Sequence, residues 1–210
     1  MKRLEITMID YVHNKTEVIA KELLGKLLIH ETPDGVYSGY IVETEAYIGI
    51  EDMACHTYEG KRTPKVESMY QTGGTIYIYT MHTHAMLNIV TKKQNDPQAV
   101  LIRAIEPACG LDRMVRNRST TGVAVCNGPG KLTKAMAITK ELNGMKIDAS
   151  ALTIDGTLGK IPASIVASAR VGIPNKGDWT LKPLRFFVEG NPYVSGMRKR
   201  DYKALADCWS

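Results

Sequence analysis

The stretch VYSGYIVETEAYI, residues 36–48, is rich in β-branched and aromatic side chains, which predicts one long strand. The preceding segment KLLIHE, residues 26–31, predicts a second strand, because turn-forming residues join the two. Farther along the chain, TIYIYTM, AMLNIVT and AVLIRAIE predict three more strands, at residues 75–81, 85–91 and 99–106. Together these segments predict a largely antiparallel sheet.

Helices are expected at the periphery of this sheet. Residues 15–24 predict a first helix with Asn14 as its N-cap, and residues 111–117 and 131–138 predict two more. Residues 49–74 are polar and contain several glycines, which predicts a long loop of the kind that is usually functional in a compact domain. The segment RFFVEG near the C-terminal end predicts a further short strand.

Composition is that of a globular protein. The chain has 210 residues and a formal net charge of +5, and no repeat or composition break divides it. We therefore expect a single α+β domain over residues 1–210, with a protruding β-hairpin. No apolar run is long enough to span a membrane and no signal peptide is visible, so we expect a cytoplasmic location. The four cysteines form no Cys-x-x-Cys pair, which favours free thiols over a zinc site or a disulfide framework.

Basic residues come in short groups. Such groups on loops can neutralise phosphates along a nucleic acid duplex, but they can equally be solvated surface charge. The groups are Lys61, Arg62 and Lys65; Lys92 and Lys93; Arg113, Arg116 and Arg118; Lys131 and Lys134; and Arg198, Lys199 and Arg200. Composition alone leaves both interpretations open.

Candidate chemistry is concentrated on the first long strand. Glu43, Glu45 and Tyr47 share one face of it, because side chains alternate along a strand. That face is either solvated or lines a pocket. Arg103 lies in the middle of an apolar strand and needs a buried partner, which a carboxylate such as Glu45 would provide.

Two other motifs suggest different chemistry. His82 and His84 form a His-x-His pair, which together with His56 could bind a metal ion, although the pair falls where a hairpin tip is expected. The segment GPGKL, residues 128–132, lacks the first glycine and the final Ser or Thr of a nucleotide-binding P-loop. Its glycine-rich turn could still hold one phosphate of a nucleic acid.

Taken in order, these segments resemble the alkyladenine (3-methyladenine) DNA glycosylase family. The resemblance covers nearly the whole chain, and IVETEAY and VLIRAIEP are its most distinctive parts. The matching segments are IVETEAY, EDMACH, RTP, GTIYIY, MLNI, VLIRAIEP, GPGKL, ARVGI and KPLRFFVEGNPYVS. The resemblance implies a monofunctional glycosylase of base excision repair that acts on duplex DNA as a monomer, without a metal or other cofactor.

The resemblance also implies roles for particular residues. The flipped base is expected to lie between Tyr47, His56 and Tyr79, with Tyr77 as support. In the catalytic step, Glu45 is expected to deprotonate the attacking water, which Arg103 and the backbone carbonyl of Val171 help to hold. The remaining expected contacts are Asn88 against the 2-amino group of guanine, the backbone of His56 against the base, and Lys131, Arg62 and Thr63 against DNA.

One position departs from the family pattern. Well-known members place a tyrosine at the hairpin tip, where it wedges into the minor groove, and here the matching residue is His82. Imidazole is smaller and more polar than phenol, so flipping is the step that this difference affects. A wedge residue cannot also be a buried metal ligand. Two alternatives stay open: a non-catalytic nucleic-acid-binding module, and a metal-dependent hydrolase that uses His56, His82 and His84.

Overall fold

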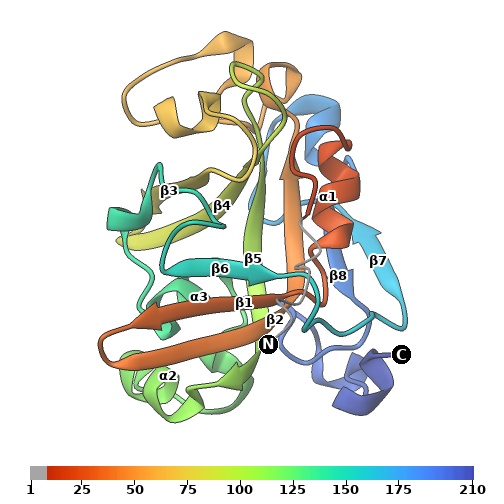
Figure 1. The fold of residues 1–210 in the computed structure, drawn as a ribbon. Coiled ribbons are helices and arrows are strands. Elements are labelled where there is room, and N and C mark those ends of the chain that lie inside the picture. Colours follow the sequence, from red (N-terminus) through yellow and green to blue (C-terminus); the bar gives the residue numbers. More distant parts are fainter. Residues whose placement is uncertain (1–8) are drawn as a thin grey trace.

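The computed structural model describes residues 9–210 and contains an eight-stranded antiparallel sheet flanked by three α-helices (Figure 1). Six strands follow the order β3-β4-β5-β2-β1-β6, while β8 pairs with β2 and β7 pairs with β8. The strands are β1 (Leu27–Thr32), β2 (Gly35–Tyr47), β3 (Ile76–Met81), β4 (His84–Thr91), β5 (Gln98–Cys109), β6 (Leu152–Asp155), β7 (Ile165–Ser168) and β8 (Arg185–Val188). The predicted α+β fold on a largely antiparallel sheet is confirmed.

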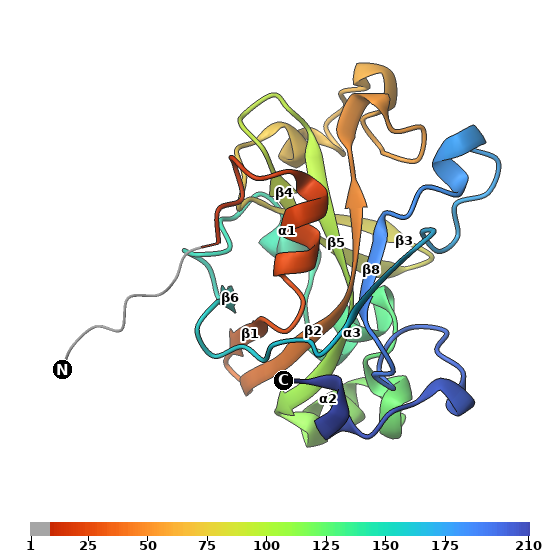
Figure 2. The same ribbon diagram turned by 90° about the vertical axis from the view of Figure 1, so that its right-hand side faces the viewer.

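The three helices lie outside the sheet, as expected. They are α1 (Thr16–Glu22), α2 (Leu111–Arg118) and α3 (Pro129–Ala135). Helix α1 packs against β2, β5 and β8, whereas α3 packs against β4 and β5 and is itself covered by α2 (Figure 2). The predicted N-cap was wrong. Lys15 occupies that position without a side-chain bond, and the backbone carbonyl of Asn14 accepts a hydrogen bond from Lys92 Nζ at 2.8 Å.

Strand β2 is the centre of the sheet. Its first half pairs with β1, and its second half lies between β5 and β8. The pairing with β5 shifts register on both sides of Glu43, and Glu45 then lies opposite Leu101 on β5 and Arg185 on β8. The strand that carries Glu43 and Glu45 is thus paired on both sides, and both carboxylates are completely buried.

Strand β3 separates two apolar clusters, as its alternation predicts. Ile76 and Ile78 point into the main core, which is shared with α1 and α3. Tyr77 belongs to a smaller cluster with Cys55 and Met69, against which Tyr79 packs. This second cluster packs side chains of the long loop after β2 against β3, β4 and β5.

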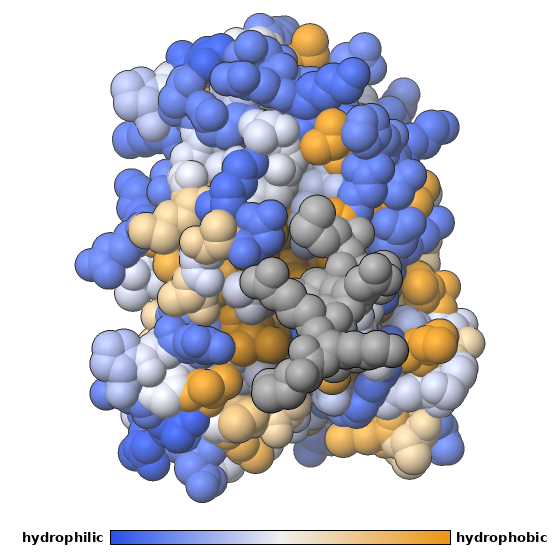
Figure 3. Space-filling view, in the orientation of Figure 1, coloured by the Kyte–Doolittle hydropathy of each residue, from blue (hydrophilic) through white to orange (hydrophobic). Residues whose placement is uncertain are grey.

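The long loop after β2 contains three short 3-10 turns and no longer helix. These turns are η1 (Gly49–Glu51), η2 (Tyr58–Gly60) and η3 (Glu67–Tyr70). The loop lies at the top of Figure 1, and Figure 3 shows that hydrophilic residues cover this end of the molecule. Within residues 9–210, no helix is both long and apolar enough to cross a membrane.

Candidate active site

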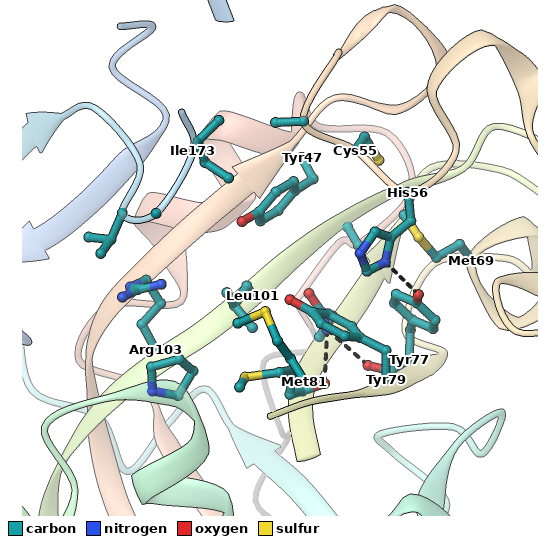
Figure 4. A pocket seen from close by; sticks show the side chains of 17 residues that line it. Tyr47, Cys55, His56, Met69, Tyr77, Tyr79, Met81, Leu101, Arg103 and Ile173 are labelled. Carbon is teal, nitrogen blue, oxygen red and sulfur yellow. Dashed lines mark hydrogen bonds between the residues drawn. The ribbon is translucent and has the colours of Figure 1, made fainter. Parts of the chain in front are cut away.

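A cavity of about 170 Å³ lies between the β3–β4 hairpin, the end of β2 and two loops (Figure 4). Seven residues predicted from the sequence to form the site line this cavity: Tyr47, His56, Tyr77, Tyr79, Asn88, Arg103 and Val171. Three methionines, Met69, Met81 and Met86, add flexible apolar surface. The structure thus brings together side chains that are spread over most of the chain.

Aromatic rings form two opposing walls. Tyr47 lies on one side of the cavity, and His56, Tyr77 and Tyr79 lie on the other (Figure 4). His56 meets Tyr79 edge to face at a centroid distance of 4.5 Å, and its Nδ1 hydrogen-bonds to the Tyr77 hydroxyl at 2.9 Å. Desolvation lowers the pKa of His56, which keeps the imidazole neutral at pH 7. The gap between the walls suits a flat, aromatic ligand.

Asn88 presents one particular atom to the cavity. Its side-chain NH₂ donates to the backbone carbonyls of Tyr77 and Met86, at 3.1 and 3.0 Å. Both donors are thereby used, and the amide oxygen is left to meet a ligand. An acceptor at this point discriminates between ligands by their hydrogen-bonding groups.

Glu45 is completely buried and lies directly behind the lining of the cavity. The Val171 N–H donates to Oε1 at 2.7 Å, and the Tyr47 hydroxyl donates to Oε2 at 2.9 Å. Arg103 Nη1 lies 3.3 Å from the same Oε2, so the predicted partnership of Glu45 and Arg103 is present. The backbone group of Val171 that reaches Glu45 is the N–H, whereas the sequence prediction concerned the carbonyl.

The electrostatic balance at Glu45 is between burial and its partners. Burial raises the pKa of this carboxyl, while Arg103, the Val171 N–H and the Tyr47 hydroxyl each oppose the shift, and the net pKa is above its ordinary value. A carboxylate with a raised pKa accepts a proton readily, which is the property that a general base requires.

Glu43 holds Arg103 in place from the opposite side. Its buried carboxylate accepts from Arg103 Nε at 3.0 Å and from Arg185 Nε at 2.6 Å. It also accepts from the Ser195 N–H and hydroxyl, both at 2.8 Å. The face of β2 that carries the two glutamates is therefore not solvated. Sequence reasoning missed Arg185 and Ser195, although Arg185 begins a segment that pairs with β2.

The tip of the β3–β4 hairpin is exposed and conformationally unusual. His82 and Thr83 both have positive φ, at 47° and 69°, which is strained for a β-branched residue such as Thr83. Behind the tip, Thr133 on α3 donates to the carbonyl of Ala85 at 2.8 Å, which fixes the hairpin to the helix. Among the described residues, His56, His82 and His84 do not form a group that could hold a metal ion.

The predicted DNA-contacting residues Arg62, Thr63 and Lys131 lie outside the cavity, and two of them, Arg62 and Lys131, have side-chain partners within the chain. The Arg62 guanidinium pairs with Glu67 through two bonds, reaches Asn95 Oδ1 at 2.9 Å and lies over the ring of Tyr70. Lys131 Nζ donates to Asn127 Oδ1 at 2.7 Å. Thr63 is half-buried in the long loop. Binding a phosphate at Arg62 or Lys131 would mean exchanging these internal contacts.

Residues 10–192 match the protein family described as Methylpurine-DNA glycosylase (MPG). The chain belongs to this family. It is also 54% identical, over 95% of its own length and 99% of theirs, to proteins of Staphylococcus aureus strains MRSA252 and bovine RF122 / ET3-1. Both are named "Putative 3-methyladenine DNA glycosylase". The family resemblance inferred from the sequence is confirmed, and with it the general assignment as a DNA glycosylase of DNA repair.

Proposed function

We propose that this protein flips damaged purine nucleotides out of duplex DNA and hydrolyses their N-glycosidic bond with a water molecule that Glu45 activates. The observation that carries the proposal is the position of Glu45. It is a fully buried carboxylate, bonded to Arg103 and to the Val171 backbone, directly behind the lining of a cavity with aromatic walls. A binding module without catalysis has no need to bury a carboxylate there.

The chemistry of the bond explains why a carboxylate is useful. Cleavage of an N-glycosidic bond passes through an oxocarbenium-like sugar, as in glycoside hydrolysis. A carboxylate beside the anomeric carbon stabilises this positive charge and takes a proton from the attacking water. In this proposal, Arg103 and the backbone carbonyl of Val171 hold the water while Glu45 deprotonates it.

The proposed substrates are 3-methyladenine, 7-methylguanine, hypoxanthine and ethenoadenine. Tyr47 would stack on one face of the flipped base and His56 with Tyr79 would meet the other, with Tyr77 supporting this wall and the His56 backbone contacting the base. Cationic alkylated purines gain cation–π attraction from such rings and leave without protonation. Asn88 at the floor of the slot would crowd the 2-amino group of guanine and so discourage unmodified guanine.

The proposed flipping step depends on the hairpin tip. His82 would enter the minor groove and fill the space that the extruded nucleotide leaves, while Lys131, Arg62 and Thr63 would contact the backbone. Extrusion costs a few kcal/mol and costs less for a weakly paired lesion, so selectivity would begin before the base reaches the slot.

A base-release assay tests this function directly. The full chain, acting as a monomer, should release at least one of the four bases from duplex DNA, and release should continue in the presence of a chelator. Failure of the wild-type protein to release any of them would leave the binding-module alternative in its place. Activity that a chelator removes and a divalent ion restores would favour the metal-dependent hydrolase.

The same assay tests whether the reaction ends at an abasic site. Bifunctional glycosylases attack with an amine and form a Schiff base, whereas the proposed mechanism uses water. We expect no strand cleavage after base release. Borohydride trapping of a covalent protein–DNA adduct would overturn the monofunctional assignment without affecting the glycosylase activity itself.

A further inference from the structure

A buried ion pair outside the lining of the cavity joins Asp52 in the long loop to Arg170. The two side chains are completely buried, and the guanidinium meets the carboxylate through two parallel bonds, Nη1 to Oδ2 at 2.5 Å and Nη2 to Oδ1 at 2.8 Å. Arg103, which is also buried, contacts Glu45 and Glu43 instead. The pair of Asp52 and Arg170 is therefore a separate device from the catalytic pair described above.

The pair fastens three segments to one another. The Asp52 carboxylate accepts from the backbone N–H of Ile48, at the end of β2, and of Ala54, two residues before His56. Arg170 Nη1 also donates to the backbone carbonyl of Ala46 at 3.0 Å. Burying two charges is costly unless hydrogen bonds compensate for the lost water. Here both carboxylate oxygens and both terminal nitrogens of the guanidinium have partners, several of them backbone groups of the cavity walls, and only Arg170 Nε is left without one among the described residues.

Arg170 also contacts Tyr47 directly. The guanidinium carbon lies 4.7 Å from the centroid of the Tyr47 ring. Tyr47 lines the cavity and Arg170 does not, so the arginine supports the ring from the side away from the cavity. A guanidinium stacked on an aromatic ring restricts the orientation of that ring.

Two of the three donors that converge on Glu45 depend on this arrangement. One is the Tyr47 hydroxyl, whose ring rests on Arg170, and the other is the N–H of Val171, the residue that follows Arg170 in the chain. A displacement of Arg170 would therefore move both donors together, while Arg103 would stay fixed by Glu43.

We propose that Arg170, fixed by Asp52, is the positioning residue that sets the Tyr47 wall of the slot and the Glu45 carboxylate in register with each other. The proposal rests on the function proposed above, since it takes Tyr47 to stack on the base and Glu45 to activate the water. Lysine cannot replace this arginine, because an ammonium group lacks the planar fork that bonds Asp52 and stacks on Tyr47 at once.

The test is single-turnover base release from a hypoxanthine- or 3-methyladenine-containing duplex, with the protein in excess, over a range of pH. Arg170→Lys should lower the rate constant by about 100-fold, the effect of misplacing a catalytic group by about 1 Å. The acidic limb of its rate–pH profile should move to higher pH, because the Tyr47 and Val171 donors no longer favour the ionised form of Glu45. Asp52→Asn should move the limb in the same direction and by less.

The dependence of the rate constant on protein concentration separates positioning from folding. A variant that only folds poorly needs more protein to saturate the DNA, but at saturation it reacts with the wild-type rate constant and the wild-type pH profile. That result for both variants would overturn the proposal. Because the rate constant at saturation reports only on DNA bound by folded protein, a preparation with a small folded fraction still decides the question.

A matched control is the partly buried pair of Lys160 and Glu106, which lies at the other end of β5. Lys160→Met removes one partner of Glu106, far from Glu45, and should leave the acidic limb unmoved. A combined variant adds a second check, because Tyr47→Phe in the Arg170→Lys background should shift the limb by less than it does in wild-type protein. Fully additive shifts would contradict the proposal.

Failure of the proposed function is distinguishable from failure of the positioning role. If wild-type protein releases no base at all, the proposed function is wrong; if wild-type protein releases base and the Arg170 variant has an unchanged rate constant and pH profile, only the positioning role is wrong.

Discussion

At the scale of single residues, Tyr47 connects the cavity wall proposed to stack on the base with the carboxylate proposed to activate water. Its ring forms one wall of the cavity, and its hydroxyl donates to Glu45 at 2.9 Å. Burial, followed by the nearby Glu45 charge, raises the pKa of Tyr47 well above its ordinary value, so the phenol remains a donor at any physiological pH. The two properties of this residue can be separated by removing the oxygen alone.

Tyr47→Phe should keep the stacking surface and move the acidic limb of the rate–pH profile upward. The hydroxyl favours the ionised carboxylate, so its loss raises the pKa of Glu45 further, and a general base must be ionised to act. On the acidic limb, moving the profile upward by one pH unit lowers the rate about tenfold, and above the limb the rates should converge. The measurement is base release between pH 4 and pH 9.

Tyr77→Phe is the comparison for this prediction. The Tyr77 hydroxyl bonds to His56 and makes no contact with Glu45, so this variant should leave the position of the acidic limb unchanged. Equal movements of the limb in the two variants would mean that the hydroxyl contact to Glu45 does not control its ionisation.

At the scale of elements, the β3–β4 hairpin packs so closely against α3 that the helix has room only for a glycine at the contact, Gly130. A Cβ on Gly130 would lie 2.7 Å from the Cβ of His84, which is closer than real Cβ atoms approach each other. The hairpin and the helix can therefore pack only because residue 130 is glycine. The strained tip at His82 and Thr83 projects from this support.

Gly130→Ala should displace the hairpin tip and weaken flipping, at a stability cost of about 1–3 kcal/mol from overpacking. His82→Ala should weaken flipping without that cost, because His82 is exposed. His82→Tyr should improve flipping or leave it unchanged. The measurements are urea unfolding and the fluorescence of a reporter base beside the lesion.

The hairpin would have a different role if Gly130→Ala lost stability yet flipped the lesion normally. A clear loss of flipping in His82→Tyr would mean that the tip meets DNA in another way than the wedge model requires.

At the scale of the whole molecule, strand β5 links the site to the C-terminal segment. Arg103 lies within it at the cavity, and Glu106 lies farther along towards its end. The Glu106 carboxylate accepts from Lys160 Nζ at 2.7 Å, Asn191 Nδ2 at 2.8 Å and Trp209 Nε1 at 3.1 Å. One buried acid thus ties three distant segments to the sheet.

Glu106→Ala should lower the free energy of unfolding by about 2–4 kcal/mol, since it leaves buried Asn191 and the half-buried indole of Trp209 without an acceptor. Lys160 is about one-third exposed and contributes little to this loss. The single-turnover rate constant of base release should not change. Urea unfolding measures the loss of stability, and the release assay measures the rate constant. A slower rate with unchanged stability would contradict the structural role of Glu106.

Sequence reasoning reached most of the fold because strand signals are local. Alternation in TIYIYTM placed Tyr77 and Tyr79 on one face, and the structure has them there. The predicted N-cap was wrong because the helix begins one residue later: the carbonyl of Lys15 accepts the first helical hydrogen bonds, from Val18 and Ile19, while the carbonyl of Asn14 bonds Lys92 instead. The cavity-lining residues came from the order of the motifs along the chain.

The supporting contacts could not be predicted in the same way. Asp52 and Arg170 are far apart in sequence, and neither lies in a segment whose periodicity indicates burial. Glu43 could equally have faced solvent, and only its contacts with Arg185 and Ser195 assign it to the interior. Long-range polar contacts of this kind depend on the packing of β2 between β5 and β8, which no local pattern specifies.

The central claim is that Glu45 drives the attack of water on the glycosidic bond. The most direct test compares wild-type protein with Glu45→Gln on the same lesion-containing duplex, by single-turnover base release and by affinity. We expect Glu45→Gln to bind the lesion duplex as the wild-type protein does and to release no measurable base. Base release by Glu45→Gln at a rate near that of the wild-type protein would contradict the claim.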